Sequence, residues 1–223
     1  MAWKNALIIG ASGGIGAALV AALEVRGVQV KTLSRSADGL DITDEASVER
    51  SLGALQQTFD LIIVATGALV IDGAEPEKSL KQISGQAMMD QFAVNAVGPA
   101  LILARAAKLT TRDRPAHIAV LSARVGSIGD NRLGGWYSYR AAKAAVNQIV
   151  HTAAIELART HKQLNCVALH PGTVQTPFTA KYVERHKTVS ADQAVQNLLG
   201  VLDGLTPKET GSFYDWSGAK VPW

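Results

Sequence analysis

Short apolar runs alternate along this chain with longer segments whose apolar positions recur every three to four residues. The short runs are apolar at consecutive positions, which is typical of parallel strands covered on both faces. The longer segments have helical spacing and carry capping residues: Gly27 follows the first, and Thr43 or Asp44 precedes the second. The expected strands are Ala6–Gly10, Val28–Leu33, Leu61–Ala65, His117–Ser122, Asn165–His170 and Ser212–Tyr214, and the expected helices are Ile15–Arg26, Glu45–Gln57, Met88–Leu109 with a bend at Pro99, Tyr139–Arg159 and Asp192–Leu202.

The order of these elements, strand and helix in alternation, predicts an α/β fold with right-handed crossovers. We expect a single domain over residues 1–223, built as a Rossmann-type, doubly wound parallel β-sheet with helices on both faces. In such sheets ligands bind at the carboxyl ends of the strands. Glycine-rich or polar segments follow almost every expected strand, so the sequence predicts a ligand site at that edge.

Composition and charge narrow the classes of function. Apolar residues make up 48% of the chain and charged residues 18%, as in an ordinary globular enzyme. The net charge is +3 and the basic residues are scattered, so we expect no nucleic-acid partner. We interpret the tightest basic group as a solvated face, with attraction of an anionic ligand as the alternative. This group consists of Lys181, Arg185, His186 and Lys187.

The expected environment of the protein follows from its apolar runs and its cysteine content. The chain lacks the uninterrupted run of about 20 apolar residues that a membrane span needs, so we expect no membrane partner. The only cysteine, Cys166, lies in an apolar run, where we expect a small core residue rather than a nucleophile. One cysteine forms no internal disulfide, and we expect a cytoplasmic protein without a metal site.

A glycine-rich segment, Gly10-Ala11-Ser12-Gly13-Gly14-Ile15-Gly16, joins the first expected strand to the first helix. Glycine lets the backbone turn sharply and approach a pyrophosphate, whose charge meets the helix N-terminus. The spacing is Gly-x-x-x-Gly-x-Gly, not the Gly-x-Gly-x-x-Gly of the broader fingerprint. We interpret the segment as a dinucleotide-binding loop, with a purely structural turn as the alternative. Its expected contacts are Gly10, Ser12, Gly14, Ile15 and Gly16.

The end of the second expected strand indicates which dinucleotide is bound. NAD enzymes generally place an acidic residue there to hold the ribose hydroxyls. This chain has Arg35, whose guanidinium pairs well with a 2′-phosphate, so the sequence favours NADP(H). Asp38 lies close enough to leave NAD open, and a plain surface cation is the other interpretation of Arg35.

Tyr139 and Lys143 stand four residues apart on an expected helix, so their side chains share a face. A phenol has a pKa of ~10, and a cation within reach lowers it by ~1–3 units. We expect Lys143 to act in this way on Tyr139. The phenol would then protonate a carbonyl oxygen, or deprotonate an alcohol in the reverse direction.

Together these motifs resemble the short-chain dehydrogenase/reductase family over nearly the whole chain. The resemblance implies an adenine contact at Asp41 and Ile42, and an adenosine contact at Ala65-Thr66-Gly67. It also implies a catalytic asparagine at Asn95, which holds a water in a proton relay with the lysine. The same resemblance implies nicotinamide-side contacts at Pro171, Gly172, Val174 and Thr176.

Within that family the chain is most similar to the small C-factor and sniffer-type carbonyl reductases. The similarity lies in the loop segments 126–131 and 134–137 and in the ending, residues 213–216 with 222–223. The family commonly has a second serine where this chain has Ala123, and that serine bonds the substrate carbonyl. We expect Ser122 to serve instead, with Ser127 nearby as the alternative. Tyr137 is a second phenol, but it lacks a lysine four residues on.

The resemblance implies an oxidoreductase that moves a hydride between NADP(H) and a small carbonyl or alcohol substrate, covered by residues Phe178–Ser190. A signalling or regulatory protein that binds NADP with little turnover is the alternative, motivated by Ala123. A nucleotide-sugar epimerase also uses Tyr-x-x-x-Lys, but this chain has no room for a sugar-binding domain. The family resemblance further implies a homodimer or homotetramer that packs through Met88–Leu109 and Tyr139–Arg159.

Overall fold

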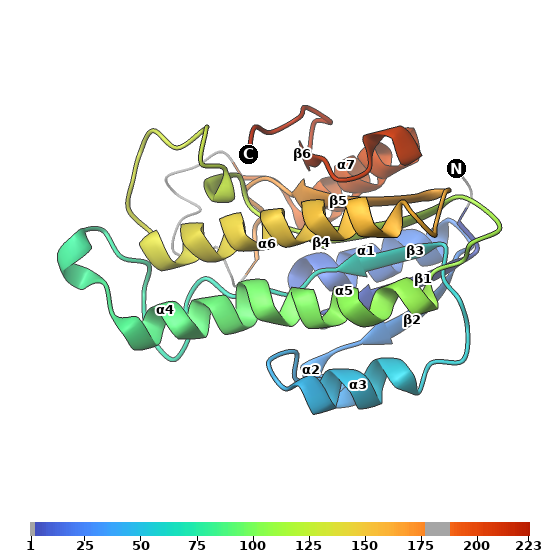
Figure 1. Cartoon of the computed structure of the whole chain (residues 1–223), viewed down its shortest axis with the longest axis horizontal. Helices are drawn as coiled ribbons and strands as arrows, with labels where there is room; N and C mark the ends of the chain where they lie inside the picture. Colours follow the sequence, from blue (N-terminus) through green and yellow to red (C-terminus); the bar gives the residue numbers. More distant parts are fainter. Residues whose placement is uncertain (1–2, 177–187) are drawn as a thin grey trace.

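The computed structural model describes residues 3–176 and 188–223, in which a parallel sheet is covered by helices on both faces (Figure 1). The strands are β1 Asn5–Ile9, β2 Gln29–Leu33, β3 Leu61–Val64, β4 Ala116–Leu121, β5 Leu164–His170 and β6 Phe213–Asp215. The helices are α1 Gly14–Val25, α2 Arg35–Asp38, α3 Glu45–Gly53, α4 Gly85–Phe92, α5 Gly98–Leu109, α6 Tyr137–Leu157 and α7 Ala191–Gly204. The shorter segments are η1 Leu80–Gln82, η2 Ala93–Val97 (a π-turn), η3 Arg124–Gly126 and η5 Pro207–Glu209.

Within the described residues the sheet order is β2-β1-β3-β4-β5-β6, and all neighbouring strands pair in parallel. The expected α/β fold is therefore confirmed, and each expected strand lies within one residue of its observed bounds. Paired registers bring Ile9 beside Val64, Val64 beside Val120, and Val120 beside Ala168. The carboxyl ends of the four central strands are thus level, so the loops that follow them meet at one edge.

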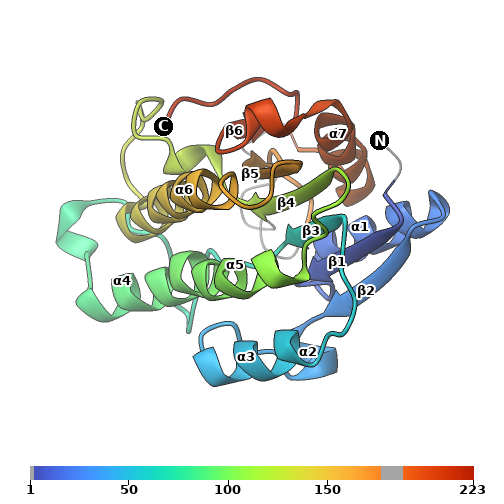
Figure 2. The same cartoon turned by 45° about the vertical axis from the view of Figure 1, so that its right-hand side comes forward.

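Alternate residues of each central strand point into two separate cores. In β1, Leu7 and Ile9 pack toward α3, α5 and α6, whereas Ala6 and Ile8 pack toward α1 and α7. Figure 2 shows the strands between these two helical layers. Burial on both faces explains why the strand sequences are apolar at consecutive positions.

Local sequence explains how the helices begin and end. Gly27 adopts a left-handed φ of 77° just after α1, and the side chain of Asp44 accepts a hydrogen bond from the Ala46 amide at the start of α3. The expected C-cap and one of the two expected N-caps are therefore confirmed. The expected helix Glu45–Gln57 ends early, at Gly53, because glycine is a poor helix former.

The long helical segment from Gly85 to Leu109 is irregular before Pro99 and not at Pro99 itself, where we expected the bend. It begins at the Ser84 cap, and its irregularity is the π-turn η2, which ends just before that proline. Proline has no amide hydrogen to donate to the carbonyl of Asn95, so the regular helical ladder is broken one turn earlier. Asn95 therefore lies in the irregular part of the helix.

The same segment, Gly85–Leu109, is long and apolar enough to cross a membrane by length and composition, with a mean hydropathy of 1.3 over its most apolar stretch. Its residues Ile102, Leu103 and Ala106 lie in the core against the sheet. Core helices of globular proteins pass the same composition test, so the finding is weak evidence for a membrane span.

Candidate active site

A cavity of about 780 Å³ lies at the carboxyl edge of the sheet. Its walls come from the loops after β1, β3, β4 and β5 and from the first turns of α6, as the strand-end rule predicts. From the expected site it contains Ser12, Gly14, Ile15, Ala65, Gly67, Ser122, Tyr139, Lys143, Pro171, Gly172, Val174 and Thr176.

The glycine-rich loop has the close backbone contacts that require glycine. Gly10 has a φ of 90°, and a Cβ on Gly16 would lie 2.1 Å from the Gly10 carbonyl oxygen. A Cβ on Gly14 would lie 2.6 Å from Cγ2 of Thr176, so the loop after β1 touches the loop after β5. Helix α1 begins at Gly14 with no side-chain cap and no acidic residue in its first turn. No acidic side chain in this first turn therefore offsets the positive end of the helix.

Tyr139 and Lys143 are 5% and 3% exposed and both line the cavity. The Lys143 Nζ lies 5.8 Å from the centre of the Tyr139 ring and donates a hydrogen bond to the Leu121 carbonyl at 3.2 Å. A Cβ on Gly126 would lie 2.7 Å from the Lys143 carbonyl carbon, so the loop after β4 presses directly on α6. Tyr137 does not line the cavity, which agrees with the preference for Tyr139.

Burial shifts the pKa of both Tyr139 and Lys143. It raises the pKa of the Tyr139 phenol and lowers the pKa of Lys143 to about 8. The expected lowering of the phenol pKa by the lysine is thus not the net direction in this structure. The reason is that a low-dielectric environment disfavours the phenolate and the ammonium alike.

Asn95 is fully buried on the π-turn η2 and makes three hydrogen bonds. Its Oδ1 accepts from the Ala68 amide at 3.1 Å, while its Nδ2 donates to the Ala68 carbonyl at 2.8 Å and to Gln91 Oε1 at 2.7 Å. A Cβ on Gly67 would lie 3.0 Å from Asn95 Oδ1 and 3.4 Å from Lys143 Nζ. The two side chains therefore flank the same glycine, although Asn95 itself does not line the cavity.

Ser122 and Ser127, the two serines that were candidates to bond the substrate carbonyl, both donate hydrogen bonds within the protein. Ser122 lines the cavity, but its hydroxyl donates to Asn147 Oδ1 of α6 at 2.6 Å. Ser127 bonds the Pro222 carbonyl and does not line the cavity. Ala123 does line it. The role expected of Ser122 stays a prediction, and it requires the hydroxyl to leave Asn147.

Of the residues expected on the adenosine side, Ala65 and Gly67 line the cavity, whereas Arg35, Asp41 and Ile42 lie outside it, after β2. Arg35 is exposed and makes no ion pair within the described residues, whereas the Asp38 carboxylate accepts from the Ser34 amide at 2.8 Å. The Asp41 carboxylate accepts from the Thr43 hydroxyl at 2.7 Å, which lowers the Asp41 pKa. Ile42 is buried, and a Cβ on Gly98 would lie 2.8 Å from its Cδ1. The Ile42 side chain thus packs on the start of α5.

The loop after β5 is anchored at both ends. Gly172 has a φ of 82° and a Cβ there would lie 3.0 Å from Cδ1 of Trp216, so the indole covers this turn. Val174 pairs with Val189, and the Gln175 amide donates to the Val189 carbonyl at 2.9 Å. Most of the expected substrate cover, Phe178–Ser190, and the basic group at residues 181–187 lie outside the described residues.

Several cavity residues escaped the sequence analysis. His170 lines the cavity, burial lowers its pKa to about 4, and its Nδ1 has no hydrogen-bond partner among the described residues. Arg124 lines it too, and pairs with Asp215 at 3.1 Å. The strand-end rule points to His170, because it is the last residue of β5. No local signal connects Arg124 to Asp215, 91 residues away.

Comparisons with known proteins agree with this geometry. The family model described as short chain dehydrogenase matches residues 4–187. A 1-hydroxy-2-glutathionyl-2-methyl-3-butene dehydrogenase of Rhodococcus sp. (strain AD45) is 28% identical over 99% of this chain and 100% of its own length. The C-signal of Myxococcus xanthus is 34% identical over 61% of this chain and 78% of its own length.

Solved structures show the same fold. An NADPH-bound carbonyl reductase from chicken fatty liver superposes with a TM-score of 0.83 at 24% identity, covering 100% of both chains. A short-chain dehydrogenase/reductase from Burkholderia multivorans with bound NADP superposes with a TM-score of 0.81 at 26% identity, covering 99% of this chain and 100% of that one. The carbonyl reductase Sniffer of D. melanogaster reaches 0.81 at 19% identity, covering 99% of each chain. The chain therefore belongs to the short-chain dehydrogenase family.

Proposed function

We propose that this protein is an NADP(H)-dependent oxidoreductase that interconverts a carbonyl compound and an alcohol, with Tyr139 as the general acid and base. The observation that carries the proposal is the buried Tyr139–Lys143 pair in a cavity that also includes the glycine-rich loop. The cofactor, when bound, supplies or accepts the hydride. The family of the chain supports this class of reaction.

The residues present fit a dinucleotide phosphate. The basic side chains that line the cavity are Arg124, Arg140, Lys143 and His170, and no aspartate or glutamate is among the described lining residues. Gly13 and Gly14 line the cavity and have no side chains, so the backbone itself faces the cavity at the start of α1. Such a surface, with a helix N-terminus, three cationic side chains and a neutral histidine, suits an anion.

The environment of β2 supports NADP rather than NAD. Asp38 is the acidic residue nearest to the place where NAD enzymes hold the ribose, and its carboxylate is bonded to the Ser34 amide and hydroxyl. Arg35 is exposed beside it and forms no ion pair within the described residues, and the Asp41 carboxylate interacts with its charge only at longer range, so its guanidinium is open to a 2′-phosphate. The NADP and NADPH named for the two solved structures above agree with this assignment.

The proton steps follow from the polar residues around the cavity. Tyr139 would donate its phenolic proton to the substrate oxygen. Lys143, when protonated, favours the phenolate that remains, since an opposite charge offsets part of the burial cost. Asn95 holds the segment at Ala68 by two backbone hydrogen bonds and lies beside the lysine, where it fits the family's relay role.

A second candidate function is a signalling or regulatory protein that binds NADP with little turnover. Two observations favour it: Ala123 lines the cavity where the family commonly has a serine, and the C-signal is a relative. Loss of one such hydrogen-bond donor costs ~10²–10³ in rate. The two candidates differ in turnover, not in binding.

The deciding experiment measures NADPH binding and NADPH oxidation with a panel of aldehydes, ketones and diketones. The oxidoreductase is expected to turn over at least one class, and Tyr139→Phe to lower kcat by ~10²–10⁴ while the Kd for NADPH stays within about threefold. Tyr137→Phe is the matched control and is expected to change neither quantity. Tight NADPH binding without turnover, unchanged in Tyr139→Phe, would establish the second candidate instead.

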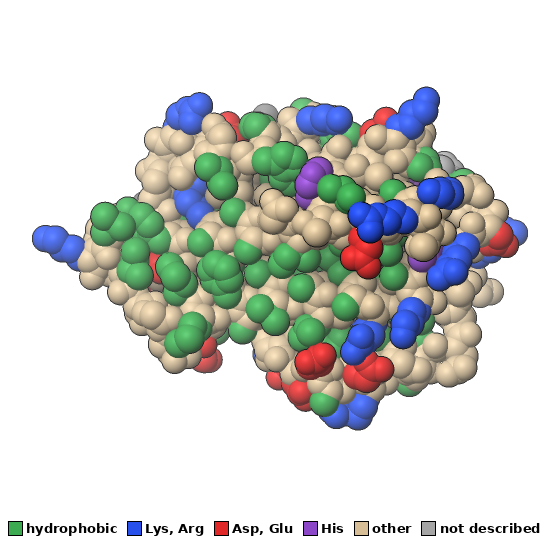
Figure 3. Space-filling model, viewed as in Figure 1, with side chains coloured by type: hydrophobic (Ala, Val, Ile, Leu, Met, Phe, Trp, Pro, Cys, Tyr) green, Lys and Arg blue, Asp and Glu red, His purple; other side chains and the backbone are tan. Residues whose placement is uncertain are grey.

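We further infer a homo-oligomer in the cytoplasm. Figure 3 shows apolar side chains gathered over α4, α5 and α6, and the charged ones lie mainly toward the edges of this face. Met89 of α4 and Val97 of η2 are 60% and 47% exposed, although both are large and apolar. A second copy of the chain, packed on this face, would cover them.

A further inference from the structure

Glu77 is a buried acid that the proposed reaction does not use. It lies between β3 and η1 and is 6% exposed. Its Oε2 accepts from the Ser138 amide at 3.2 Å, and its Oε1 accepts from the Ser138 hydroxyl. Ser138 directly precedes Tyr139, so a carboxylate from 61 residues earlier in the chain holds the first turn of α6.

The Glu77 backbone also bonds the segment 134–136, which precedes α6 in an unusual conformation. Gly134 and Gly135 both have a φ of 65°, and Trp136, the residue before α6, has a φ of 53°. A non-glycine residue in this left-handed region is strained and persists only where surrounding contacts impose it. The amide of Trp136 donates to the Glu77 carbonyl. Glu77 therefore bonds the start of α6 through both its backbone and its side chain.

These contacts lie directly against the reacting phenol. The Trp136 and Tyr139 rings are 6.2 Å apart, edge to face, and both line the large cavity. On its other side Tyr139 borders a second, small cavity together with Glu77 and Ser138. A shift of the first turn of α6 would therefore move the phenol and the wall of the substrate cavity together.

We propose that Glu77 is a positioning residue: its carboxylate fixes the first turn of α6 and thereby aims the Tyr139 phenol at the substrate oxygen. Glu77 itself touches neither substrate nor cofactor in this assignment. The inference rests on the proposed function only for the role of Tyr139 as proton donor. Misplacement of a reacting group by about 1 Å can cost 10²-fold in rate, which sets the size of the expected effect.

The test compares Glu77→Gln, Glu77→Ala and Ser138→Ala with Glu156→Gln, an exposed acid near the other end of α6. Glu77→Ala is expected to lower kcat by about 10- to 100-fold with the Kd for NADPH within twofold, because only the phenol is displaced. Glu77→Gln is expected to lose less, since its amide oxygen still accepts one of the two bonds. The double variant Glu77→Ala/Ser138→Ala is expected to be no worse than Glu77→Ala alone. Glu156→Gln is expected to match the wild type.

Two readouts do not depend on turnover. Hydrogen exchange at the Trp136 and Ser138 amides is expected to accelerate in the Glu77 variants, and the ring resonance of Tyr139, assigned with Tyr139→Phe, is expected to shift. A wild type without turnover would refute the proposed function, while these two readouts would still decide the case of Glu77. An unshifted Tyr139 resonance, or equal losses in kcat and NADPH affinity, in folded variants would overturn the positioning role. If Glu77→Ala does not fold, Glu77→Gln and Ser138→Ala give the same decision.

Discussion

At the residue scale, Lys143 combines a functional position with a cost to stability. The ammonium is 3% exposed and lies deep beside the phenol it would serve. Burial of a charged amine disfavours its protonated form, which is why the Lys143 pKa falls to about 8 from 10.5. The protein therefore folds more readily without this charge than with it, although the proposed reaction needs it.

We predict that Lys143→Met stabilises the protein and abolishes turnover. Between pH 8 and pH 10.5 the unfolded chain binds more protons at this residue than the folded one, so the contribution of Lys143 to wild-type stability rises with pH across that window. The buried Cys166 thiol, whose pKa burial raises to about 12, contributes in the opposite direction above about pH 9, so the Lys143 contribution is the difference between the wild type and Lys143→Met. At neutral pH the burial of the Lys143 ammonium lowers the free energy of unfolding by its full amount. A pKa shift of this size corresponds to about 3 kcal/mol as an upper bound. Urea unfolding from pH 7 to pH 10.5 measures the free energy of unfolding of both proteins, and Lys143→Met is expected to lack the pH dependence that Lys143 causes.

The matched control for this prediction is Lys108→Met, which removes an exposed amine near the end of α5. It is expected to leave both the pH dependence and kcat unchanged. A Lys143→Met variant that is less stable than the wild type at pH 7 would show that the ammonium is satisfied in the fold, contrary to the expected burial cost.

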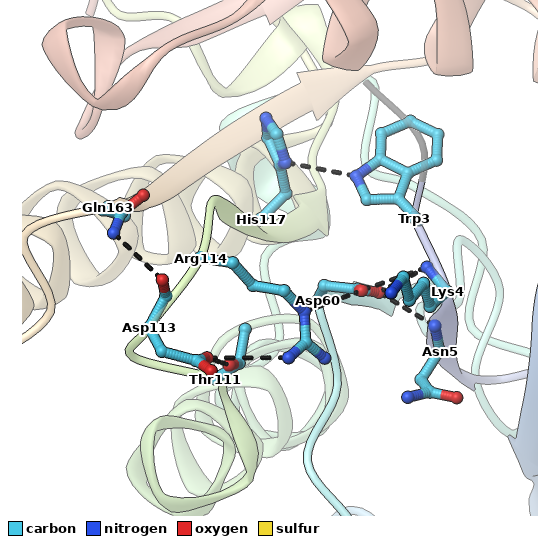
Figure 4. Close-up of polar contacts among 9 residues, drawn as sticks. All are labelled: Trp3, Lys4, Asn5, Asp60, Thr111, Asp113, Arg114, His117 and Gln163. Atoms are coloured by element: carbon cyan, nitrogen blue, oxygen red, sulfur yellow. Dashed lines mark hydrogen bonds and ion pairs between the residues drawn. The ribbon is translucent and has the colours of Figure 1, made fainter.

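At the element scale, β1 and β3 are joined by polar contacts at their amino-terminal ends, away from the cavity. Asp60, 2% exposed and just before β3, accepts from the Lys4 amide at 3.0 Å and the Asn5 amide at 2.9 Å, and Arg114 approaches it at 3.4 Å (Figure 4). The Asp60 carboxylate thus joins the start of β1 to β3. Buried amides that lose their acceptor carry a full desolvation cost.

We predict that Asp60→Ala destabilises the protein by about 2–4 kcal/mol without changing kcat at a temperature where the variant is folded. Two backbone amides lose their acceptor, but the cavity lies at the other end of the strands. Chemical denaturation and steady-state kinetics measure the two effects. The neighbouring Asp113, whose side chain is 79% exposed, provides the control: Asp113→Ala is expected to change stability by under about 1 kcal/mol. An equal loss of unfolding free energy in Asp60→Ala and Asp113→Ala would contradict the role of Asp60.

At the scale of the whole molecule, one face of the α4–α5–α6 layer is more apolar than a free surface needs to be (Figure 3). Helix α6 carries Tyr139 on its inner side and contributes to this outer face, so association would hold the catalytic helix from both sides. If a second copy of the chain covers this face, the apolar composition of Gly85–Leu109 is explained without a membrane span.

We predict that the wild type sediments as a dimer or tetramer and that Met89→Asp shifts it to a smaller species. A carboxylate in an apolar interface is unpaired and desolvated, which opposes association. Sedimentation velocity over a range of concentrations measures the change. Val25→Asp, at a residue 90% exposed at the end of α1, is the control and is expected to leave the assembly unchanged. A monomeric wild type would refute the interface.

The sequence by itself determined the strands, the long helices and the fold class, because strands buried on both faces and amphipathic helices have periodic patterns that are local. It also singled out Tyr139, Lys143 and the glycine-rich loop, whose spacing has a direct chemical meaning. It did not predict the short helix α2. Only the tertiary structure decided where the Ser122 hydroxyl points, that Glu77 bonds Ser138, and that burial raises the pKa of the Tyr139 phenol. These features depend on contacts between segments far apart in the chain and on the exclusion of water, and no local pattern of residues encodes either.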